Sequence, residues 1–331
     1  MSPLRIVSLA TVGALLAVTL GIAAILIFDA PQTPAPMPAI SGTAARDIGR
    51  LPLPPLKRFT ASDGVALAYR RYDPPKSAAG PWVAILIHGS GGSSGNMSIM
   101  GQALAQRGVA SFAPDIRGHG ASGARGDIAY RGQLEDDLND LIALVKRAYP
   151  RSRLLLVGHS SGGGFALRIA GQPIGKQFSR IVLLAPYLGP MAPTTRPGSG
   201  GWVTTATGRI VAITVLNRVG IHAFDGLPTI AFATLRSRPT FWSYRLMENF
   251  GPSDIVHTRD RQGYRLDAAR SMGPIVLFAG DGDEIMYATR YAAAFQAVKP
   301  PVEQRILRGV THMGILTEPR SVDAILATLG S

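Results

Sequence analysis

Residues 153–165 read RLLLVGHSSGGGF, an aliphatic run followed at once by a cluster of small residues. The run predicts a buried strand over 153–157, and the pattern after the cluster predicts a helix over 162–170. Between them lies G-x-S-x-G, in the strand, sharp turn and helix context that gives this pattern its meaning. Gly158 and Gly162 are needed because larger side chains there would strike the neighbouring helix and strand. The stretch therefore predicts that Ser160 projects a nucleophilic hydroxyl above a sheet, beside the positive end of a helix.

Short aliphatic runs alternate with helical stretches on both sides of this turn. Strands are expected at 65–72, 82–87, 109–112, 181–184, 275–279 and 302–307, and further helices at 134–149, 287–298 and 320–329. This alternation predicts an α/β fold, with a mostly parallel sheet and helices on both of its faces.

One long stretch, residues 187–272, interrupts the alternation. It holds no aliphatic strand run, is rich in Pro, Gly, Arg and aromatic residues, and lies between two predicted strands. An insertion of this size at the strand ends is typical of a cap over a site. Its aromatic residues could line an acyl channel or form the cap's own core; they are Phe224, Phe232, Phe241, Trp242 and Phe250.

The amino-terminal segment differs from the rest of the chain. Residues 6–28 carry no charge and, as a helix, reach roughly 35 Å, enough to cross a hydrocarbon core of about 30 Å. The run is longer than a typical signal core and lacks a clean small-x-small exit, so we expect an uncleaved membrane anchor over 1–28. A cleaved signal peptide is the alternative.

A proline-rich stretch at 29–55 follows this segment and indicates an extended, semi-rigid linker before the main domain at 56–331. Arg5 is the nearest basic residue on the amino side of the apolar run, and none follows on the other side until Arg46. The positive-inside rule then predicts a single-pass membrane protein with its catalytic domain on the exported side.

Composition excludes several classes of protein. With 46% hydrophobic and 17% charged residues, the 331-residue chain is not intrinsically disordered. The absence of cysteine excludes disulfides, thiolate metal sites and cysteine nucleophiles. The net charge is +13, but the basic residues are scattered and no aromatic-interleaved basic motif occurs, so we expect no nucleic-acid partner.

A serine hydroxyl attacks a carbonyl only when a base takes its proton and an acid orients that base. Here the acid and the histidine should follow the serine, in loops at the carboxyl ends of strands. The loop 280–283, GDGD, follows one predicted strand, and His312 follows another. Spacing from the glycine favours Asp283 as the acid, while Asp281 could instead bond its own turn. His312 is the only histidine after this loop.

Four other residues are weaker candidates for these roles. Asp115 precedes the serine, and Asp254 falls in the cap. His222 and His257 also fall in the cap, where we expect surface histidines.

Hydrolysis through a serine ester also needs preorganised backbone donors for the oxyanion. One is expected from the amide of Ser161, directly after the nucleophile. The other is expected from the loop 87–92, IHGSGG, where we favour the amide of Ser90. The alternative is that this loop is only a flexible Gly-Ser turn.

Taken together, these motifs resemble the α/β-hydrolase superfamily. The resemblance rests on Asp63-Gly64, Ile87-His88-Gly89, DIRGHGASG at 115–123, GHSSG at 158–162, Gly280-x-x-Asp283 and His312. They are most similar to the branch of monoacylglycerol lipases, lysophospholipases and serine aminopeptidase-like proteins.

This resemblance implies an α/β-hydrolase fold over residues 56–329, cap excepted. It implies that Ser160 is the nucleophile, Asp283 the acid and His312 the base, with the amides of Ser90 and Ser161 as the oxyanion hole. The cap matches no particular branch.

We therefore expect a membrane-anchored serine hydrolase that needs no metal or organic cofactor. The expected substrate is a carboxylic ester of lipid or fatty acyl type, because a bilayer tether gives access to lipid. An amide or peptide substrate for the same triad, or a non-catalytic binding protein on the same fold, are the alternatives.

Overall fold

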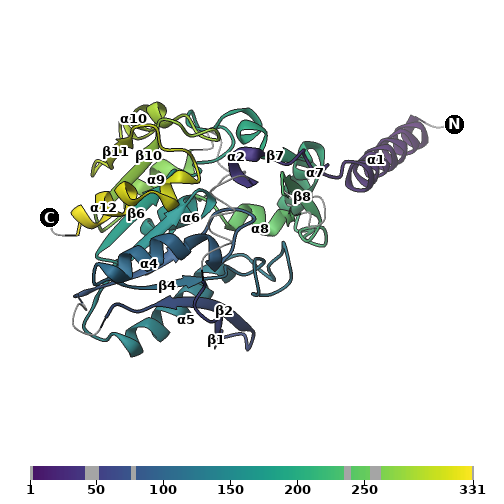
Figure 1. Cartoon of the computed structure of the whole chain (residues 1–331). Coiled ribbons are helices and arrows are strands. Elements are labelled where there is room, and N and C mark those ends of the chain that lie inside the picture. The colour runs from purple at the N-terminus through teal and green to yellow at the C-terminus, as the bar shows by residue number, and fades with distance from the viewer. Residues whose placement is uncertain (1–2, 42–51, 76–79, 235–239, 254–261, 330–331) are drawn as a thin grey trace.

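A computed structural model describes residues 3–41, 52–75, 80–234, 240–253 and 262–329, apart from the side chains of residues 3–9 and 41. Its centre is an eight-stranded sheet in the order β1-β2-β4-β3-β5-β6-β10-β11 (Figure 1). The strands are β1 Lys57–Thr60, β2 Ala66–Tyr72, β3 Trp82–Ile87, β4 Ala110–Pro114, β5 Arg153–His159, β6 Arg180–Leu184, β10 Ile275–Gly280 and β11 Glu303–Leu307. β2 pairs antiparallel with β1 and with β4, and the other pairings are parallel. The expected mostly parallel α/β fold is confirmed.

Helices cover both faces of this sheet because side chains alternate along each buried strand. Val83, Ile85 and Ile87 of β3 face a core shared with α5 and α6, whereas Ala84 and Leu86 face a second core shared with α4 and α12. The helices over the sheet are α4 Ser98–Gln106, α5 Gln133–Ala148, α6 Ser161–Ala170, α9 Gly263–Arg270, α10 Tyr291–Phe295, α11 Gly314–Thr317 and α12 Pro319–Ala327. Short 3₁₀ turns complete the connections at Ser94–Met97, Pro173–Gln177, Pro197–Gly201 and Ala288–Arg290.

The insertion between β6 and β10 builds its own small layer. It contains a three-stranded antiparallel sheet in the order β7-β8-β9 and two helices. These elements are β7 Val203–Thr205, β8 Pro228–Phe232, β9 Thr240–Ser243, α7 Thr207–Arg218 and α8 Tyr244–Asn249. α9 also falls within 187–272, but it packs against α6 of the main domain.

The amino-terminal run forms one continuous helix, α1 (Pro3–Phe28), which projects from the side of the molecule that carries α7 (Figure 1). Its segment Ala10–Phe28 is long and apolar enough to cross a membrane, as either an anchor or a signal sequence would be. The part of the linker that follows is in contact with the folded domain. Thr204 Oγ1 donates to the carbonyl of Gln32, and Met37 and Ile40 pack against the core beside the short helix α2 (Pro38–Ser41).

A buried ion pair fastens the start of the sheet to α5. Arg117, which follows β4 and is 6% exposed, makes two bonds to Asp137 of α5, at 2.8 and 2.6 Å. Its other terminal nitrogen lies 3.0 Å from Asp63, in the turn before β2. The guanidinium thus joins three segments that are distant in sequence.

We predict that Asp137→Ala lowers the free energy of unfolding by about 3 kcal/mol, because it leaves a buried guanidinium short of its closest partner. Urea unfolding in detergent would measure this. The matched control is Asp323→Ala, which removes the solvent-exposed pair with Arg107 and should cost less than about 1 kcal/mol. Equal losses in the two variants would contradict a structural role for the buried pair.

Candidate active site

Ser160 is the single residue between β5 and α6. Its backbone has φ 55° and ψ −120°, a conformation that residues with a side chain rarely adopt. Three hydrogen bonds hold it there: Ser160 N donates to Leu184 O at 2.9 Å, and Ser160 O accepts from the amides of Gly164 and Tyr187 at 3.0 and 2.9 Å. The strained turn predicted from G-x-S-x-G is present.

The glycines around this turn allow the backbones of neighbouring segments to come into direct contact. A Cβ on Gly158 would lie 2.2 Å from the carbonyl oxygen of Gly162, and one on Gly162 would lie 2.3 Å from that of His88. Both distances are far below van der Waals contact, so no larger residue fits at either position.

Asp283 and His312 form a buried pair, and each residue is 2% exposed. His312 Nδ1 lies 2.8 Å from Asp283 Oδ2, while Asp283 Oδ1 accepts from the amides of Ile285 and Met286 at 2.8 and 2.7 Å. Burial alone would raise the pKa of Asp283, but His312 and the two amides outweigh it and hold that pKa below its usual value. The carboxylate is therefore ionised at neutral pH, and its bond to Nδ1 leaves the lone pair of His312 on Nε2.

The sheet brings this pair towards the serine turn. Ser160 follows β5, Asp283 follows β10 and His312 follows β11, so all three lie at the carboxyl ends of parallel strands, with β6 between β5 and β10. The ring centroid of His159, next to Ser160, lies 4.7 Å from that of His312 with the ring planes tilted by 47°, and His159 Nε2 donates to the His312 carbonyl at 3.0 Å.

The other candidate acids and bases have different roles or lie elsewhere. Asp281 accepts a bond from the Gly309 amide and so ties two loops together. Asp115 is buried and accepts from the amides of Ser94 and Ala121. His222 is exposed, 3.4 Å from the carboxylate of Asp225. Asp254 and His257 lie outside the described residues.

Two residues beside His312 were not singled out from the sequence. Glu284 Oε2 accepts a hydrogen bond from the backbone amide of His312 at 3.0 Å, which fixes the loop that carries this histidine. His159 holds the His312 carbonyl, and its pKa is lowered to about 3 by burial and by the proximity of His312. Their adjacency to Asp283 and Ser160 was the only signal in the sequence.

The two expected oxyanion donors belong to segments next to the serine. Ser161 is the first residue of α6, where backbone amides have no acceptor within the helix. The loop after β3 passes so close that a Cβ on Gly89 would lie 3.0 Å from Ser160 Cβ. The next residue, Ser90, accepts a bond at its hydroxyl from Trp202 Nε1 of the cap at 3.1 Å.

The cap's aromatic residues form mainly a core. Phe232, Trp242 and Phe250 are at most 4% exposed and pack against one another. Trp242 Nε1 donates to His119 Nε2 at 3.1 Å, so a cap strand is bonded to a turn of the main domain. Phe224 and Phe241 are only partly buried.

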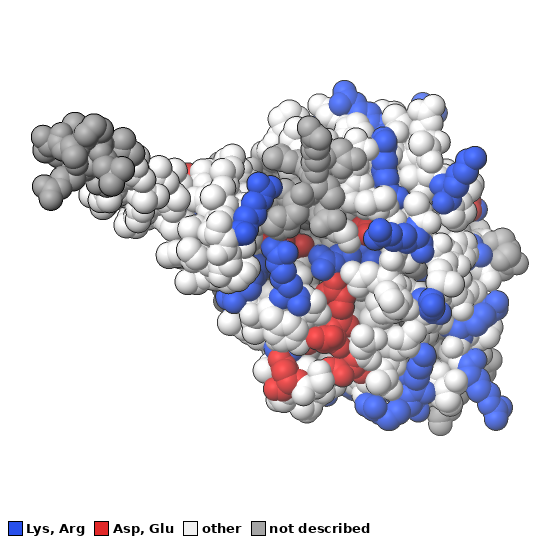
Figure 2. Space-filling view, turned by 180° about the vertical axis from the view of Figure 1, so that it is seen from behind, with Lys and Arg blue, Asp and Glu red and all other residues white. Residues whose placement is uncertain are grey.

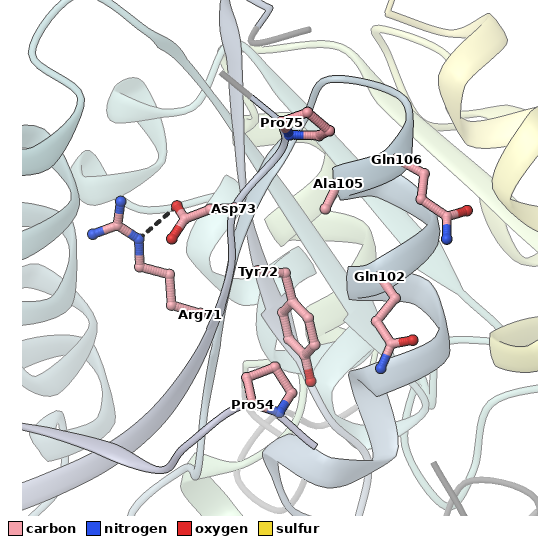
Figure 3. Close-up of a pocket in the computed structure, with 8 residues that line it drawn as sticks. All are labelled: Pro54, Arg71, Tyr72, Asp73, Pro75, Gln102, Ala105 and Gln106. Atoms are coloured by element: carbon pink, nitrogen blue, oxygen red, sulfur yellow. Dashed lines mark hydrogen bonds and ion pairs between the residues drawn. The ribbon is translucent and has the colours of Figure 1, made fainter. Parts of the chain in front are cut away.

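A shallow pocket lies away from these strand ends, where β2 meets α4 (Figure 3). It has a volume of about 310 Å³, and its lining includes Tyr72, which lies between β2 and α4, and the ion-paired Arg71 and Asp73. The sheet order separates it from the Ser160 turn by β4 and β3. Among the described residues, no group of three or more carboxylates and histidines is arranged to hold a metal ion.

The fold, with a serine at a sharp turn after β5 and an aspartate–histidine pair after β10 and β11, is that of an α/β-hydrolase. Within that class, the serine aminopeptidase S33 family model matches residues 81–224. A monoacylglycerol lipase of Mycolicibacterium smegmatis is 28% identical over 129 residues, which are 39% of this chain and 45% of that protein. The rat monoglyceride lipase is 28% identical over 139 residues, which are 42% of this chain and 45% of the rat protein. The matched region thus spans under half the length of these relatives.

Solved structures agree on the fold. A soluble variant of monoglyceride lipase from Saccharomyces cerevisiae, in complex with a substrate analogue, superposes with a TM-score of 0.61 at 17% identity. That match covers 85% of this chain and 94% of the yeast chain. Est1E from Butyrivibrio proteoclasticus, bound to ferulic acid, gives a TM-score of 0.55 at 17% identity and covers 83% and 100% of the two chains.

We predict that Asp283→Asn lowers kcat by about 10⁴, because the amide disturbs the tautomer of His312, as loss of the triad acid does in serine proteases. Asp281→Asn is the matched control and should leave kcat close to that of the wild type. Steady-state hydrolysis of a p-nitrophenyl ester would measure both. A larger loss in Asp281→Asn would reverse the assignment of the acid.

Buried neutral histidines should make the fold sensitive to acid. Burial lowers the pKa values of His119 and His159 to about 3, so both stay neutral in the folded chain while the unfolded chain takes up protons below about pH 6.5. Stability is thus complete above that pH and falls towards pH 3, by up to about 2.7 kcal/mol per pH unit from the two groups. We predict that His119→Gln lowers the measured slope by up to about 1.4 kcal/mol per pH unit, the contribution of one group, while His159 and the buried His88, whose pKa is also lowered, keep theirs. Urea unfolding at stepped pH would measure it, and an unchanged slope would contradict the role of His119.

Proposed function

We propose that this chain is a serine hydrolase that cleaves carboxylic esters, with Ser160 as the nucleophile, His312 as the base and Asp283 as the acid. One observation carries the proposal. A serine held at a turn with positive φ lies at the same end of the sheet as a buried histidine whose Nδ1 is bonded to an ionised aspartate. That arrangement activates a hydroxyl without a metal or an organic cofactor.

The reaction runs through an ester on the serine. His312 Nε2 takes the proton of Ser160 Oγ as the oxygen attacks the ester carbonyl, and the amides of Ser90 and Ser161 donate to the resulting oxyanion. Collapse breaks the ester C–O bond, and the His312 proton passes to the departing alkoxide. Water, deprotonated by the same nitrogen, then attacks the acyl-enzyme and releases the acid and the free serine. Asp283 stays ionised throughout and stabilises the imidazolium.

The favoured substrate is a lipid ester of monoacylglycerol or lysophospholipid type. Two kinds of evidence support it: relatives named as monoacylglycerol or monoglyceride lipases, and an apolar helix suited to a bilayer. In this proposal residues 1–28 anchor the chain, 29–55 link it, and 56–331 form the hydrolase domain with its cap at 187–272. The charge at Arg5 favours an exported domain.

An amide or peptide bond is the second candidate. The matching family model is described as a serine aminopeptidase, and the same triad can expel an amine. Comparing kcat/KM for a monoacylglycerol with that for an aminoacyl p-nitroanilide separates the two, and we expect the ester to be the better substrate.

We predict that the wild-type chain is labelled by a fluorophosphonate, which requires an activated serine but no knowledge of the substrate. Ser160→Ala should abolish both labelling and ester hydrolysis, because it removes the attacking oxygen. Ser161→Ala is the control, since it removes the neighbouring hydroxyl and keeps the backbone amide. Labelling that survives in Ser160→Ala but disappears in Ser161→Ala would falsify the assignment.

A further inference from the structure

The last turns of α1 are packed against the cap. Ile22 and Leu26 of α1 join a small apolar cluster with Ala212 and Ile213 of α7. Figure 1 shows α1 leaving the molecule beside α7, at the end opposite to β11. The apolar helix is therefore held by the cap.

Polar bonds lock the two helices at this junction. The carboxylate of Asp29, just after α1, accepts the backbone amide of Arg209 in the first turn of α7 at 2.8 Å. The Arg209 side chain reaches back to the carbonyl of Ile27 at 3.3 Å and also to that of Pro228 at 2.8 Å. Gly208 allows this approach, because a Cβ there would lie 2.8 Å from the Asp29 carboxylate. Each helix thus supplies a polar group that bonds the end of the other.

If α1 crosses a bilayer, its length determines how deep α7 lies relative to the hydrocarbon core. A hydrocarbon core of about 30 Å takes about 20 residues of helix. Arg5 must stay outside that core, so the lipid-embedded stretch starts at Ile6 and reaches about Ile25. Ile22 and Leu26, which contact the cap, therefore lie at the boundary of the hydrocarbon, and α7 lies at the same level.

The outer face of α7 has the composition expected at that level. Val211 and Val215 of α7 and Val219, the residue just after it, follow one another at four-residue spacing and are 56%, 45% and 70% exposed. Arg218 is the charged residue exposed beside them, and α7 contains no acid. In Figure 2 the described part of α1 likewise carries no charged side chain, whereas basic residues are spread over the body of the molecule. The apolar surface of α1 thus continues onto the cap.

We propose that this face of α7, the valine face (Val211, Val215 and Val219), is a lipid-binding surface that lies in the interface of the bilayer crossed by α1. The proposal rests on the membrane anchoring proposed above and adds a second contact, through the cap itself. Apolar side chains with a flanking arginine suit the boundary between acyl chains and headgroups. Because the cap is bonded to the loops that carry Ser90 and Asp283, this contact holds the Ser160 side of the domain near the lipid surface.

The test uses the full chain, which has no cysteine, so that each introduced cysteine is the only labelling site. Val215→Cys reports the valine face, and Leu16→Cys reports the middle of α1. Ile306→Cys is the matched control, because this β11 residue is 44% exposed and lies at the far end of the domain from α1 (Figure 1). Each variant is labelled with an environment-sensitive fluorophore and reconstituted into phosphatidylcholine–phosphatidylglycerol vesicles. Lipids that carry a nitroxide either near the headgroup or deep in the acyl chain are then used to quench the fluorophore. Fluorophosphonate labelling verifies that each variant is folded.

We expect deep nitroxides to quench the label at residue 16, shallow nitroxides to quench that at residue 215, and neither to quench that at residue 306. If the label at 215 behaves like that at 306 while 16 is quenched, the lipid-binding face is overturned and the anchor stands. If 16 is not quenched, anchoring fails and the proposal fails with it. Disulfide cross-linking between chains through Val215→Cys in detergent would identify a second copy of this chain as the occupant, and would also overturn the proposal.

Discussion

Around Ser160, backbone atoms of neighbouring segments are in direct contact, with no room for a side chain between them. The geometry of the site depends on these contacts. The exit of β3 touches Gly162, and the segment after β6 touches Gly164, where a Cβ would lie 2.3 Å from the Tyr187 carbonyl. The opposite side of the site is built in the same way, since a Cβ on Gly280 would lie 1.9 Å from the carbonyl of Val310. The candidate nucleophile and the candidate acid–base pair are thus positioned by direct contact between neighbouring strand exits, which is more rigid than positioning by long side chains.

The cap is bonded to the main domain close to each part of the site. Trp202 bonds the hydroxyl of Ser90, Trp242 bonds His119, and Arg196 donates to the carbonyl of Asp283 at 3.1 Å. The first segment of the cap also pairs with the loop after Asp283, through Thr195 and Met286. A displacement of the cap must therefore break bonds at Ser90, at His119 or at the loop that carries Asp283. Cap position and site geometry are coupled for this reason.

The sequence predicted the parts of the fold that one local signal determines. β3, β5 and β10 are mostly apolar runs because both faces of the sheet are covered, and the Ser160 turn is marked by its glycines. The cap sheet carries no such signal. β7 has only three residues and β8 begins with a proline, so these strands depend on pairing and on packing around Trp242. The roles of His159 and Glu284 likewise escaped prediction, because both depend on contacts with His312, which is 153 and 28 residues away.

A series of contacts connects the apolar helix α1 to the candidate active site. α1 is bonded to α7 through Asp29 and Arg209, α7 belongs to the cap, and the cap is bonded to the loop that carries Asp283. A helix joined to the main domain only by a flexible linker would leave the site free to face any direction. Here the described linker residues also contact the cap and core, through Gln32 and Ile40. If α1 lies in a bilayer, the direction of the cap relative to the lipid surface is therefore fixed by the fold.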